Sequence, residues 1–354
     1  MSSADQDYDK RIREQIAQYA KPEEQIELGP IYHYWIDTHI RPRLKAVFDV
    51  PDVLMLYCHY AAKAMHEPGA GRRIVSLGAG DCVHEINMIK RLVEMGETAF
   101  AFEAIELSPI RFNIARAAAA AAGVEKYLVL KEADLNEWRP TEKYSAVIAK
   151  DTLHHILGLE QLFDAIHDAL EENGVFMTTD MIGRNGHMRW PEALEIIQGL
   201  WRFIPDRYKM NHQLKRFEKE YDNWDCAKTG FEGIRAQDIL RLLVEKFGFR
   251  NFLGFGNLPD IFIERGFGHN LSPDNPQDTA FIDFLEQLNS LLIDLSYLKP
   301  TMIYAVMTRS GLTNLAPRCH RHWTPEFCVR AGPPARGPLD ISKVLSQPLF
   351  GSKL

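Results

Sequence analysis

The chain has 354 residues, of which 46% are apolar and 25% are charged, and its formal net charge at pH 7 is -7. This composition is ordinary for a globular enzyme built as one large domain or two smaller ones. The negative balance argues against duplex DNA or RNA as the main partner, because those partners call for a basic face. We therefore expect no nucleic-acid partner.

The sequence also bears on the cellular compartment of the protein and on its association with membranes. No apolar run approaches the roughly eighteen residues that a membrane span requires, and we expect no membrane partner. The first residues, MSSADQDYDK, are polar and charged, unlike a secretory signal peptide. The five cysteines are odd in number and scattered, so a disulfide framework is not indicated. These features favour a cytoplasmic protein and leave open whether it forms a homodimer.

Residues 1–70 are expected to form an N-terminal helical cap. Apolar residues recur at helical spacing over 8–19 and again over 31–48. Pro42 lies inside the second run, where it should kink or split the helix. The stretch IYHYWIDTHIRPRL, residues 31–44, is rich in aromatic and histidine side chains. Such side chains serve either to pack the cap on the core or to line a cleft.

A strand, a glycine turn and a helix are predicted in RRIVSLGAGDCVHE, residues 72–85. The apolar run Ile74–Leu77 is typical of a buried parallel strand, and Gly78 and Gly80 allow the backbone to turn tightly against a ligand. The third glycine of a dinucleotide fingerprint is absent, because Val83 stands there. The Gly-Lys-Ser/Thr of a phosphate-binding loop is absent too.

A second strand over 99–107 carries Glu106 at its tip, where a carboxylate can accept both ribose hydroxyls of a nucleoside. Ser108 and Pro109 are typical of a helix start, and Gly123 of its end. Further strands alternate with helices near Leu128, Val147 and Phe176. The alternation predicts a parallel sheet with helices on both faces and ligands beyond the carboxyl ends of the strands.

The motifs LGAG, IELSP, EADL, AVIAKDTLHHI and ENGVFMTTD stand in an order that resembles class I S-adenosylmethionine (SAM)-dependent methyltransferases. The resemblance covers residues 72–180 and, more loosely, strands near Phe249 and Met302. It implies a doubly wound, Rossmann-like α/β sheet of seven mostly parallel strands, the last one antiparallel between the fifth and sixth. Ser76 and Cys82 depart from the family pattern, which usually has an acidic residue and a glycine there.

The resemblance implies SAM as the cofactor and S-adenosylhomocysteine (SAH) as its product. Glu106 would bind the ribose, Asp134 would accept a hydrogen bond from the adenine amino group, and Leu135 would pack beside the ring. The cofactor-binding residues implied in full are Gly78, Ala79, Gly80, Glu85, Glu106, Leu107, Asp134, Leu135 and Lys150. The alternative for Glu106 is an acid at a strand end that is exposed to water. The alternative for Asp134 is a turn aspartate that bonds its own backbone.

His154 and His155 follow the fourth strand, where the family presents the methyl group to its acceptor. A free imidazole titrates near neutral pH, so either could act as a general base, and His187 could reach the same place. The alternative is one structural and one solvated histidine. A sulfonium donor is already activated, so alignment can carry most of the catalysis and no metal is expected.

Residues 182–235 interrupt the alternation and contain three tryptophans. Long connections are usually functional, and we predict a helical lid inserted after the fifth strand. The lid and the cap are expected to contact a small-molecule acceptor through Tyr32, Tyr34, Trp35, Arg184, Arg189 and Trp190. Arginine beside tryptophan suits an anionic or aromatic acceptor, and a turn that anchors the lid is the alternative.

The core is predicted to occupy 71–181 and to resume over 236–309, and residues 310–354 are predicted to be a proline-rich tail. The tail contains CHRHWTPEFC, with two cysteines and two histidines at 319–328. It lacks the Cys-x-x-Cys hairpin that a structural zinc site normally uses, so we predict no metal there.

The sequence therefore predicts a SAM-dependent methyltransferase that acts on an oxygen, nitrogen or carbon atom of a small molecule by in-line displacement. Its expected place is small-molecule biosynthesis. Two alternatives stay open: methylation of a protein or peptide side chain, and a SAM-binding regulatory subunit without transferase activity.

Overall fold

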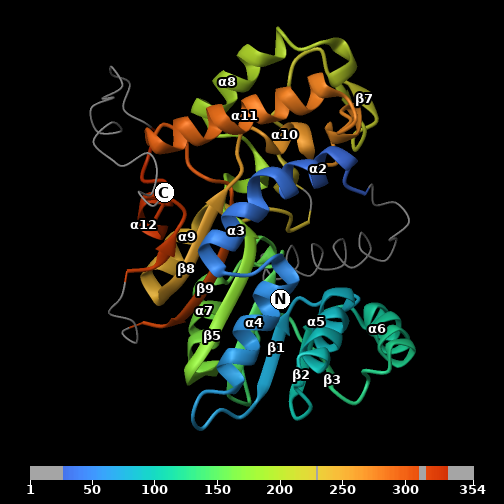
Figure 1. Cartoon of the computed structure of the whole chain (residues 1–354), viewed down its shortest axis with the longest axis vertical. Coiled ribbons are helices and arrows are strands. Elements are labelled where there is room, and N and C mark those ends of the chain that lie inside the picture. Colours follow the sequence, from blue (N-terminus) through green and yellow to red (C-terminus); the bar gives the residue numbers. More distant parts are fainter. Residues whose placement is uncertain (1–26, 229, 311–315, 334–354) are drawn as a thin grey trace, which may run out of the picture.

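The structure is a computed structural model that describes residues 27–228, 230–310 and 316–333. An eight-stranded sheet in the order β10-β8-β9-β5-β4-β1-β2-β3 forms its centre (Figure 1). The strands are β1 (Arg73–Leu77), β2 (Ala101–Glu106), β3 (Leu128–Glu132), β4 (Tyr144–Lys150), β5 (Leu170–Met181), β8 (Phe247–Phe255), β9 (Met302–Arg309) and β10 (Arg318–Cys319).

The pairing of the strands confirms the predicted doubly wound, Rossmann-like sheet. Strand β1 pairs in parallel with β2 and β4, β2 with β3, and β4 with β5. Strand β9 runs antiparallel between β5 and β8, as the resemblance implied. The order reverses at β1, because the chain winds outward to β3 and then returns to β4 on the other side of β1. Ligands of such sheets bind beyond the carboxyl ends at this reversal.

Helices cover both faces of the sheet (Figure 1). The helices of one layer are α4 (Val53–Met65), α5 (Val83–Glu94) and α6 (Pro109–Ala122). The helices of the other layer are α7 (Leu159–Ala169) and α9 (Ala236–Lys246). Residues of β4 are buried as far as Ala149, which is why its sequence, YSAVIAK, is an almost continuous apolar run.

The described part of the N-terminal cap is helical, as predicted. It consists of α2 (Pro30–Trp35), a π-helical turn η2 (Ile36–Ile40) and α3 (Arg41–Phe48), followed by α4. The irregular turn directly precedes Pro42, which has no N–H to continue the α-helical bonding. Asp52 caps α4, because its carboxylate accepts a hydrogen bond of 2.8 Å from the N–H of Met55. The helix predicted over 8–19 lies outside the described residues.

The insertion after β5 is mixed in structure rather than purely helical. It contains α8 (Pro191–Trp201), a short hairpin of β6 (Met210–Asn211) and β7 (Arg216–Phe217), and the single turns η4 (Asn185–His187), η5 (Asp206–Tyr208) and η6 (Cys226–Lys228). The indole N–H of Trp201 ties α8 to the carbonyl of Glu218 just after the hairpin, at 2.9 Å.

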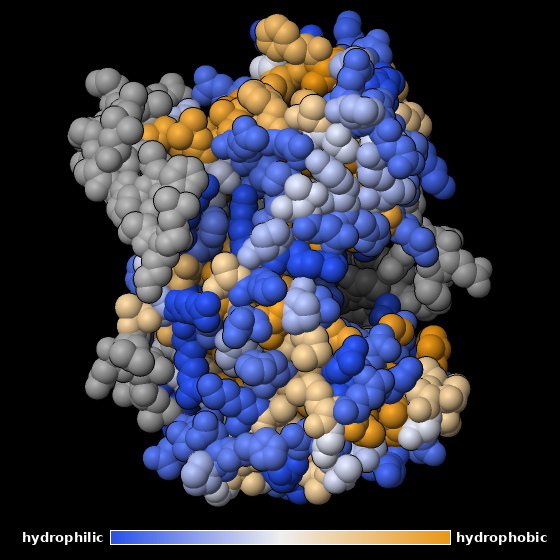
Figure 2. Space-filling view, in the orientation of Figure 1, coloured by the Kyte–Doolittle hydropathy of each residue, from blue (hydrophilic) through white to orange (hydrophobic). Residues whose placement is uncertain are grey.

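The insertion occupies one end of the molecule together with α2 and two later helices (Figure 1). These later helices are α10 (Asp260–Ile263) and α11 (Pro276–Asp294), followed in chain order by β9. The turn η7 (Gly268–Asn270) lies between them. Figure 2 shows apolar side chains gathered on the surface along α11, where Phe284 and Leu291 are 54% and 50% exposed. Among the described helices, none combines the length and apolarity that crossing a membrane demands.

The sheet has one strand more than predicted, and the extra strand comes from the predicted tail. Strand β10 pairs in parallel with β8 and extends that edge of the sheet. Trp323 is fully buried, and its indole N–H donates to Asp294 at the end of α11 at 2.7 Å. The short helix α12 (Pro325–Cys328) then contacts α9. The described residues 316–333 are therefore part of the fold and not a loose tail.

Candidate active site

The loop after β1 is shaped by two glycines. Gly78 and Gly80 have φ angles of +70° and +58°, in the left-handed region that side chains disfavour. A Cβ atom on Gly78 would lie 2.6 Å from the Cγ2 atom of Thr152, so no other residue fits against the loop after β4. The N–H groups of Gly78 and Ala79 donate to the carbonyl of Ile105 in β2, at 2.9 and 3.0 Å. The loop is thereby fixed to the neighbouring strand.

Glu106 stands at the end of β2, facing this loop. Its Oε2 atom accepts a hydrogen bond of 2.9 Å from the N–H of Gly80, and its Oε1 atom accepts one of 3.0 Å from the N–H of Ser108. Each carboxylate oxygen has a second lone pair, so the same side chain can still accept two hydroxyl donors. The two backbone bonds hold the carboxylate in place for that purpose.

A cavity of about 200 Å³ opens at these strand ends. The predicted cofactor-binding residues that line it are Gly78, Gly80, Glu106, Leu107, Asp134 and Leu135. Sequence reasoning missed further lining residues, among them Arg111, Asn136, Ile156 and Phe231. Arg111 and Phe231 were missed because they stand in a helix and in the insertion, and no strand-end motif marks them.

Asp134 forms the backbone bond of a turn aspartate, one of its two interpretations, and also lines the cavity. Its Oδ1 atom accepts hydrogen bonds from the backbone and side-chain nitrogens of Asn136, at 2.9 and 3.0 Å. The side-chain oxygen of Asn136 in turn accepts the N–H groups of Leu157 and Gly158, at 3.0 and 2.9 Å. Asp134 thus stabilises its own turn while it lines the cavity.

Three of the predicted cofactor-binding residues do not line the cavity: Ala79, Glu85 and Lys150. Glu85 is buried behind the glycine loop, and the hydroxyl of Ser76 donates to it at 2.7 Å. The serine that departs from the family pattern is therefore the direct partner of the glutamate. Lys150 forms an ion pair with Asp151, which does line the cavity.

Glu85 should make the stability of the fold depend on pH. Burial raises its pKa from 4.5 to about 7. Between these values the folded chain keeps a proton that the unfolded chain loses, so the free energy of unfolding falls as pH rises through this interval. Above pH 7 the Glu85→Gln variant should melt a few degrees higher than the wild type, and near pH 4 the two should match.

The measurement is thermal unfolding of the ligand-free protein from pH 4 to 8. Glu94→Gln is the matched control, because Glu94 lies on the same helix with an exposed side chain. A difference between the Glu85→Gln variant and the wild type that stays constant across this range would rule out Glu85 as the titrating group.

His154 lies in the 3₁₀ turn η3 (Leu153–His155) after β4 and is 3% exposed. Its Nδ1 atom contacts Asp180 Oδ1 at 2.7 Å. The other oxygen of Asp180 accepts the N–H groups of Thr152 and Leu153, at 2.9 and 2.7 Å. A carboxylate surrounded by donors accepts the Nδ1 proton, which leaves Nε2 as the functional atom of His154.

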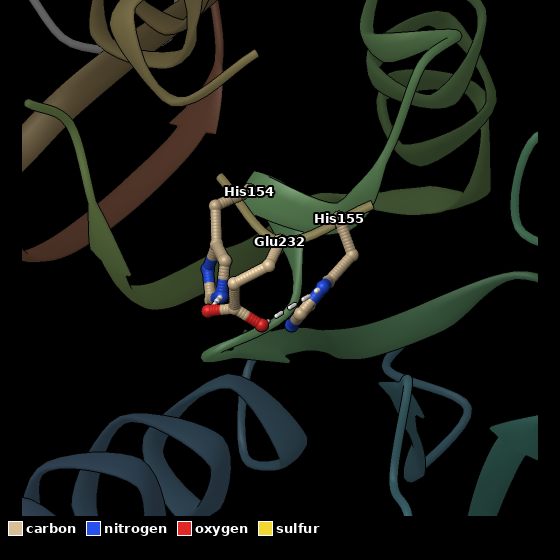
Figure 3. Close-up of side chains that lie close together, drawn as sticks. All are labelled: His154, His155 and Glu232. Atoms are coloured by element: carbon tan, nitrogen blue, oxygen red, sulfur yellow. Dashed lines mark ion pairs between the residues drawn. The ribbon is translucent and has the colours of Figure 1, made fainter. Parts of the chain in front are cut away.

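The three histidines predicted for catalysis meet at Glu232, a residue that sequence reasoning missed. His187 Nε2 lies 2.8 Å from Glu232 Oε1, His154 Nε2 lies 3.5 Å from the same oxygen, and His155 Nδ1 lies 3.7 Å from Oε2. Figure 3 shows the side chains of His154 and His155 both directed at this carboxylate. His155 also lines the cavity, so the cluster adjoins the predicted SAM site.

Burial and nearby charges shift the pKa values of His154 and His155 in opposite directions. Burial alone would lower the pKa of His154, but the carboxylates of Asp180 and Glu232 raise it to about 10. Burial and the neighbouring His154 lower the pKa of His155 to about 3. Neither pKa lies near 7, and a general base at either histidine stays a prediction.

The residues predicted to bind the acceptor separate into two groups. Tyr34 donates to Asp283 at 3.0 Å, and the indole N–H of Trp35 donates to Glu286 at 2.9 Å, so both side chains face α11. Trp190 lies against the guanidinium group of Arg330, 3.9 Å from the ring centre. The structure thus brings Tyr34, Trp35 and Trp190 into packing contacts and not to the cavity of about 200 Å³.

Arg184, His187 and Arg189 line a smaller hollow of about 20 Å³. Arg189 is buried and donates to Asp260 at 3.2 Å, which gives it a structural ion pair. Glu264 lines the same hollow, and burial raises its pKa to about 7. Tyr32 lies close enough to Glu264 and Asp151 for their charges to raise its pKa, together with burial, to about 12.

The cysteines and histidines of the C-terminal segment make other contacts in the part of the chain that the structure describes. Cys319 donates to the carbonyl of Pro317, and His320 and His322 pack against Trp323 and Phe327. The potential metal ligands that converge among the described residues are those at Glu232.

Comparisons with known proteins come from structure alone. No family model matches the chain, and no curated protein matches it in sequence. Solved structures that are similar to it include a SAM-dependent methyltransferase from Mesorhizobium loti, at 17% identity and a TM-score of 0.39, covering 73% of this chain and 100% of that one.

Two further solved structures are similar over comparable lengths. A putative sarcosine dimethylglycine methyltransferase from Galdieria sulphuraria matches at 14% identity and a TM-score of 0.41, over 71% of this chain and 84% of that one. The [4+2]-cyclase SpnF matches at 11% identity and a TM-score of 0.40, over 71% and 81%. By its own strand order and antiparallel β9, this chain has the Rossmann-like fold that a resemblance to class I SAM-dependent methyltransferases implies.

Proposed function

We propose that this protein is a SAM-dependent methyltransferase with a small-molecule acceptor. The observation that carries the proposal is the carboxylate of Glu106, which is held by two backbone N–H groups at the tip of β2 and faces a cavity at the reversal of strand order. A fixed acceptor of this kind suits a ribose diol. The glycine loop beside it lets a ligand approach the backbone closely.

The residues of the cavity would divide the binding of SAM among them. Glu106 would accept the ribose hydroxyls, and the apolar side chains of Leu135 and Ile156 would enclose the adenine ring, with Asp134 at its polar edge. Bound there, SAM supplies a methyl group already activated by a positive sulfur. Three residues, Ala79, Glu85 and Lys150, do not line the cavity and would not touch the ligand.

The acceptor would approach from the side of the histidine cluster. His155 borders the cavity, and His187 joins Glu232 from the insertion. Catalysis would rest chiefly on holding the acceptor atom in line with the methyl carbon and the sulfur. A homodimer and a place in small-molecule biosynthesis remain predictions.

The test is a transfer assay with SAM labelled in its methyl group. Purified protein is incubated with a small-molecule metabolite extract and, separately, with a peptide library. Label in a small molecule is the expected result. Label in peptides would instead favour the protein-methylating alternative, and tight SAH binding with no labelled product from either pool would favour a non-catalytic SAM-binding subunit.

The insertion of residues 182–235 is proposed to close over the bound ligands. Phe231 lines the cavity, so an occupied cavity should restrain the segment before it. Lys215 and Arg216, at the exposed tip of the β6–β7 hairpin, are natural trypsin sites. Saturating SAH should slow cleavage there severalfold, as followed by electrophoresis. Equal cleavage rates with and without SAH would count against a closing lid.

A further inference from the structure

The side chains around Glu232 are arranged as ligands of one metal ion. His154, His155 and Glu232 each offer one ligand atom, and these atoms lie within 4.8 Å of one another. Figure 3 shows the two imidazoles and the carboxylate converging on a common space. No metal was expected from the sequence, because Glu232 is 77 residues from His155 along the chain and stands in no metal-binding motif.

The separations inside the cluster match those between neighbouring ligands of a metal ion. A hydrogen bond between an imidazole nitrogen and a carboxylate oxygen spans about 2.7–3.2 Å. Oε1 of Glu232 forms an ion pair with His154 Nε2 at 3.5 Å, and Oε2 forms one with His155 Nδ1 at 3.7 Å, both longer than that span. Two tetrahedral ligands of one metal ion, with bonds of about 2.0–2.2 Å, lie about 3.3–3.6 Å apart. The observed separations are close to that range.

His154 and Glu232 are each held in orientation by a further side chain. Asp180 accepts the Nδ1 proton of His154 at 2.7 Å and so directs Nε2 toward Glu232. His187 contacts Glu232 at 2.8 Å, a true hydrogen-bond distance, and so orients the carboxylate. Metal-binding histidines and carboxylates typically have such partners, which fix the tautomer and the orientation of the ligand.

We propose that His154, His155 and Glu232 bind a divalent transition-metal ion beside the SAM cavity. Two imidazoles and one carboxylate suit zinc, iron(II), manganese or cobalt better than magnesium or calcium, which prefer oxygen ligands. Three protein ligands leave at least one coordination position open, as in catalytic rather than structural sites. Because His155 borders the cavity, a metal bound there would lie beside the place where the acceptor would lie.

The function of the metal rests on the proposed methyl transfer, whereas its binding does not. An acceptor oxygen or nitrogen bound at the open position would be fixed in place next to the methyl donor. Coordination of that kind holds and polarises the acceptor without any change in the oxidation state of the metal.

The test is a titration of chelator-treated, full-length protein with cobalt(II), followed by its visible absorption bands. The wild type should bind one ion per chain. Glu232→Gln and His155→Ala should each weaken binding by at least about tenfold, and His187→Gln, which changes an outer partner, by about tenfold to a hundredfold. His66→Ala is the matched control, because His66 pairs with Glu97 at 2.7 Å elsewhere on the chain, and it should bind cobalt like the wild type.

SAH affinity, measured by calorimetry on the same metal-free proteins, separates this proposal from the proposed function. It should be the same in the wild type and in the Glu232→Gln variant, which also shows that the variant is folded. A wild type that binds SAH but no cobalt would overturn the metal site alone. Equal cobalt binding by the wild type and the Glu232→Gln variant would overturn it too. Cobalt binding without any SAH binding would support the metal site and count against the proposed function.

Discussion

Replacing Glu106 by alanine should weaken the binding of SAH by about ten- to a hundredfold, as measured by calorimetry. The carboxylate is proposed to accept the ribose hydroxyls, and hydrogen bonds to a charged group contribute about 1.5–3 kcal/mol. The change also leaves the N–H groups of Gly80 and Ser108 without their acceptor. Both effects act on the loop beside the cavity, so the substitution should lower the affinity for SAH.

Glu132→Ala is the matched control for this variant. Glu132 ends the neighbouring strand β3 and is paired in register with Glu106, but its side chain is exposed and does not line the cavity. It should bind SAH with the affinity of the wild type. An unchanged SAH affinity in a folded Glu106→Ala protein would refute the assignment of the ribose site.

The second large effect is expected at Trp323, which does not line the cavity. Trp323→Ala should lower the free energy of unfolding by about 3–5 kcal/mol, as other deletions of large buried side chains do. The indole is fully buried, and its N–H donates to Asp294 at 2.7 Å, so both packing and a hydrogen bond are lost. Urea unfolding measures the change.

Trp224→Ala is the matched control, because it removes a tryptophan that is not buried. Trp224 is 42% exposed, so its removal should change the free energy of unfolding by less than about 1 kcal/mol. Equally small effects for the two variants would mean that the segment around Trp323 contributes little to the stability of the fold.

The residues proposed to bind SAM could be selected from the sequence because each is marked by a local signal. Gly78 and Gly80 follow an apolar run, and Glu106 ends the next one, so a parallel sheet alone brings them to the same edge. The structure places them around one cavity. The same reasoning failed to place Glu85. Its position in the motif does not show whether the side chain faces the ligand or, as in the structure, bonds to Ser76.

The aromatic residues of the cap could not be assigned from the sequence. Tyr34 and Trp35 follow Tyr32 by two and three positions, and both face α11 through Asp283 and Glu286. These partners are about 250 positions away along the chain, and only the docking of α2 on α11 decides which aromatic side chain faces which neighbour.

What the sequence determined by itself is the succession of strands and helices and the strand ends that carry Gly78, Gly80 and Glu106. Periodicity, glycines and strand-end acids are local properties of the sequence. A doubly wound sheet brings the strand ends that carry them to the same edge. Only the tertiary structure decided that β10 joins the sheet and that Glu232 meets His154. Both depend on contacts between segments far apart in the chain, where burial and charge complementarity select partners that no local pattern encodes.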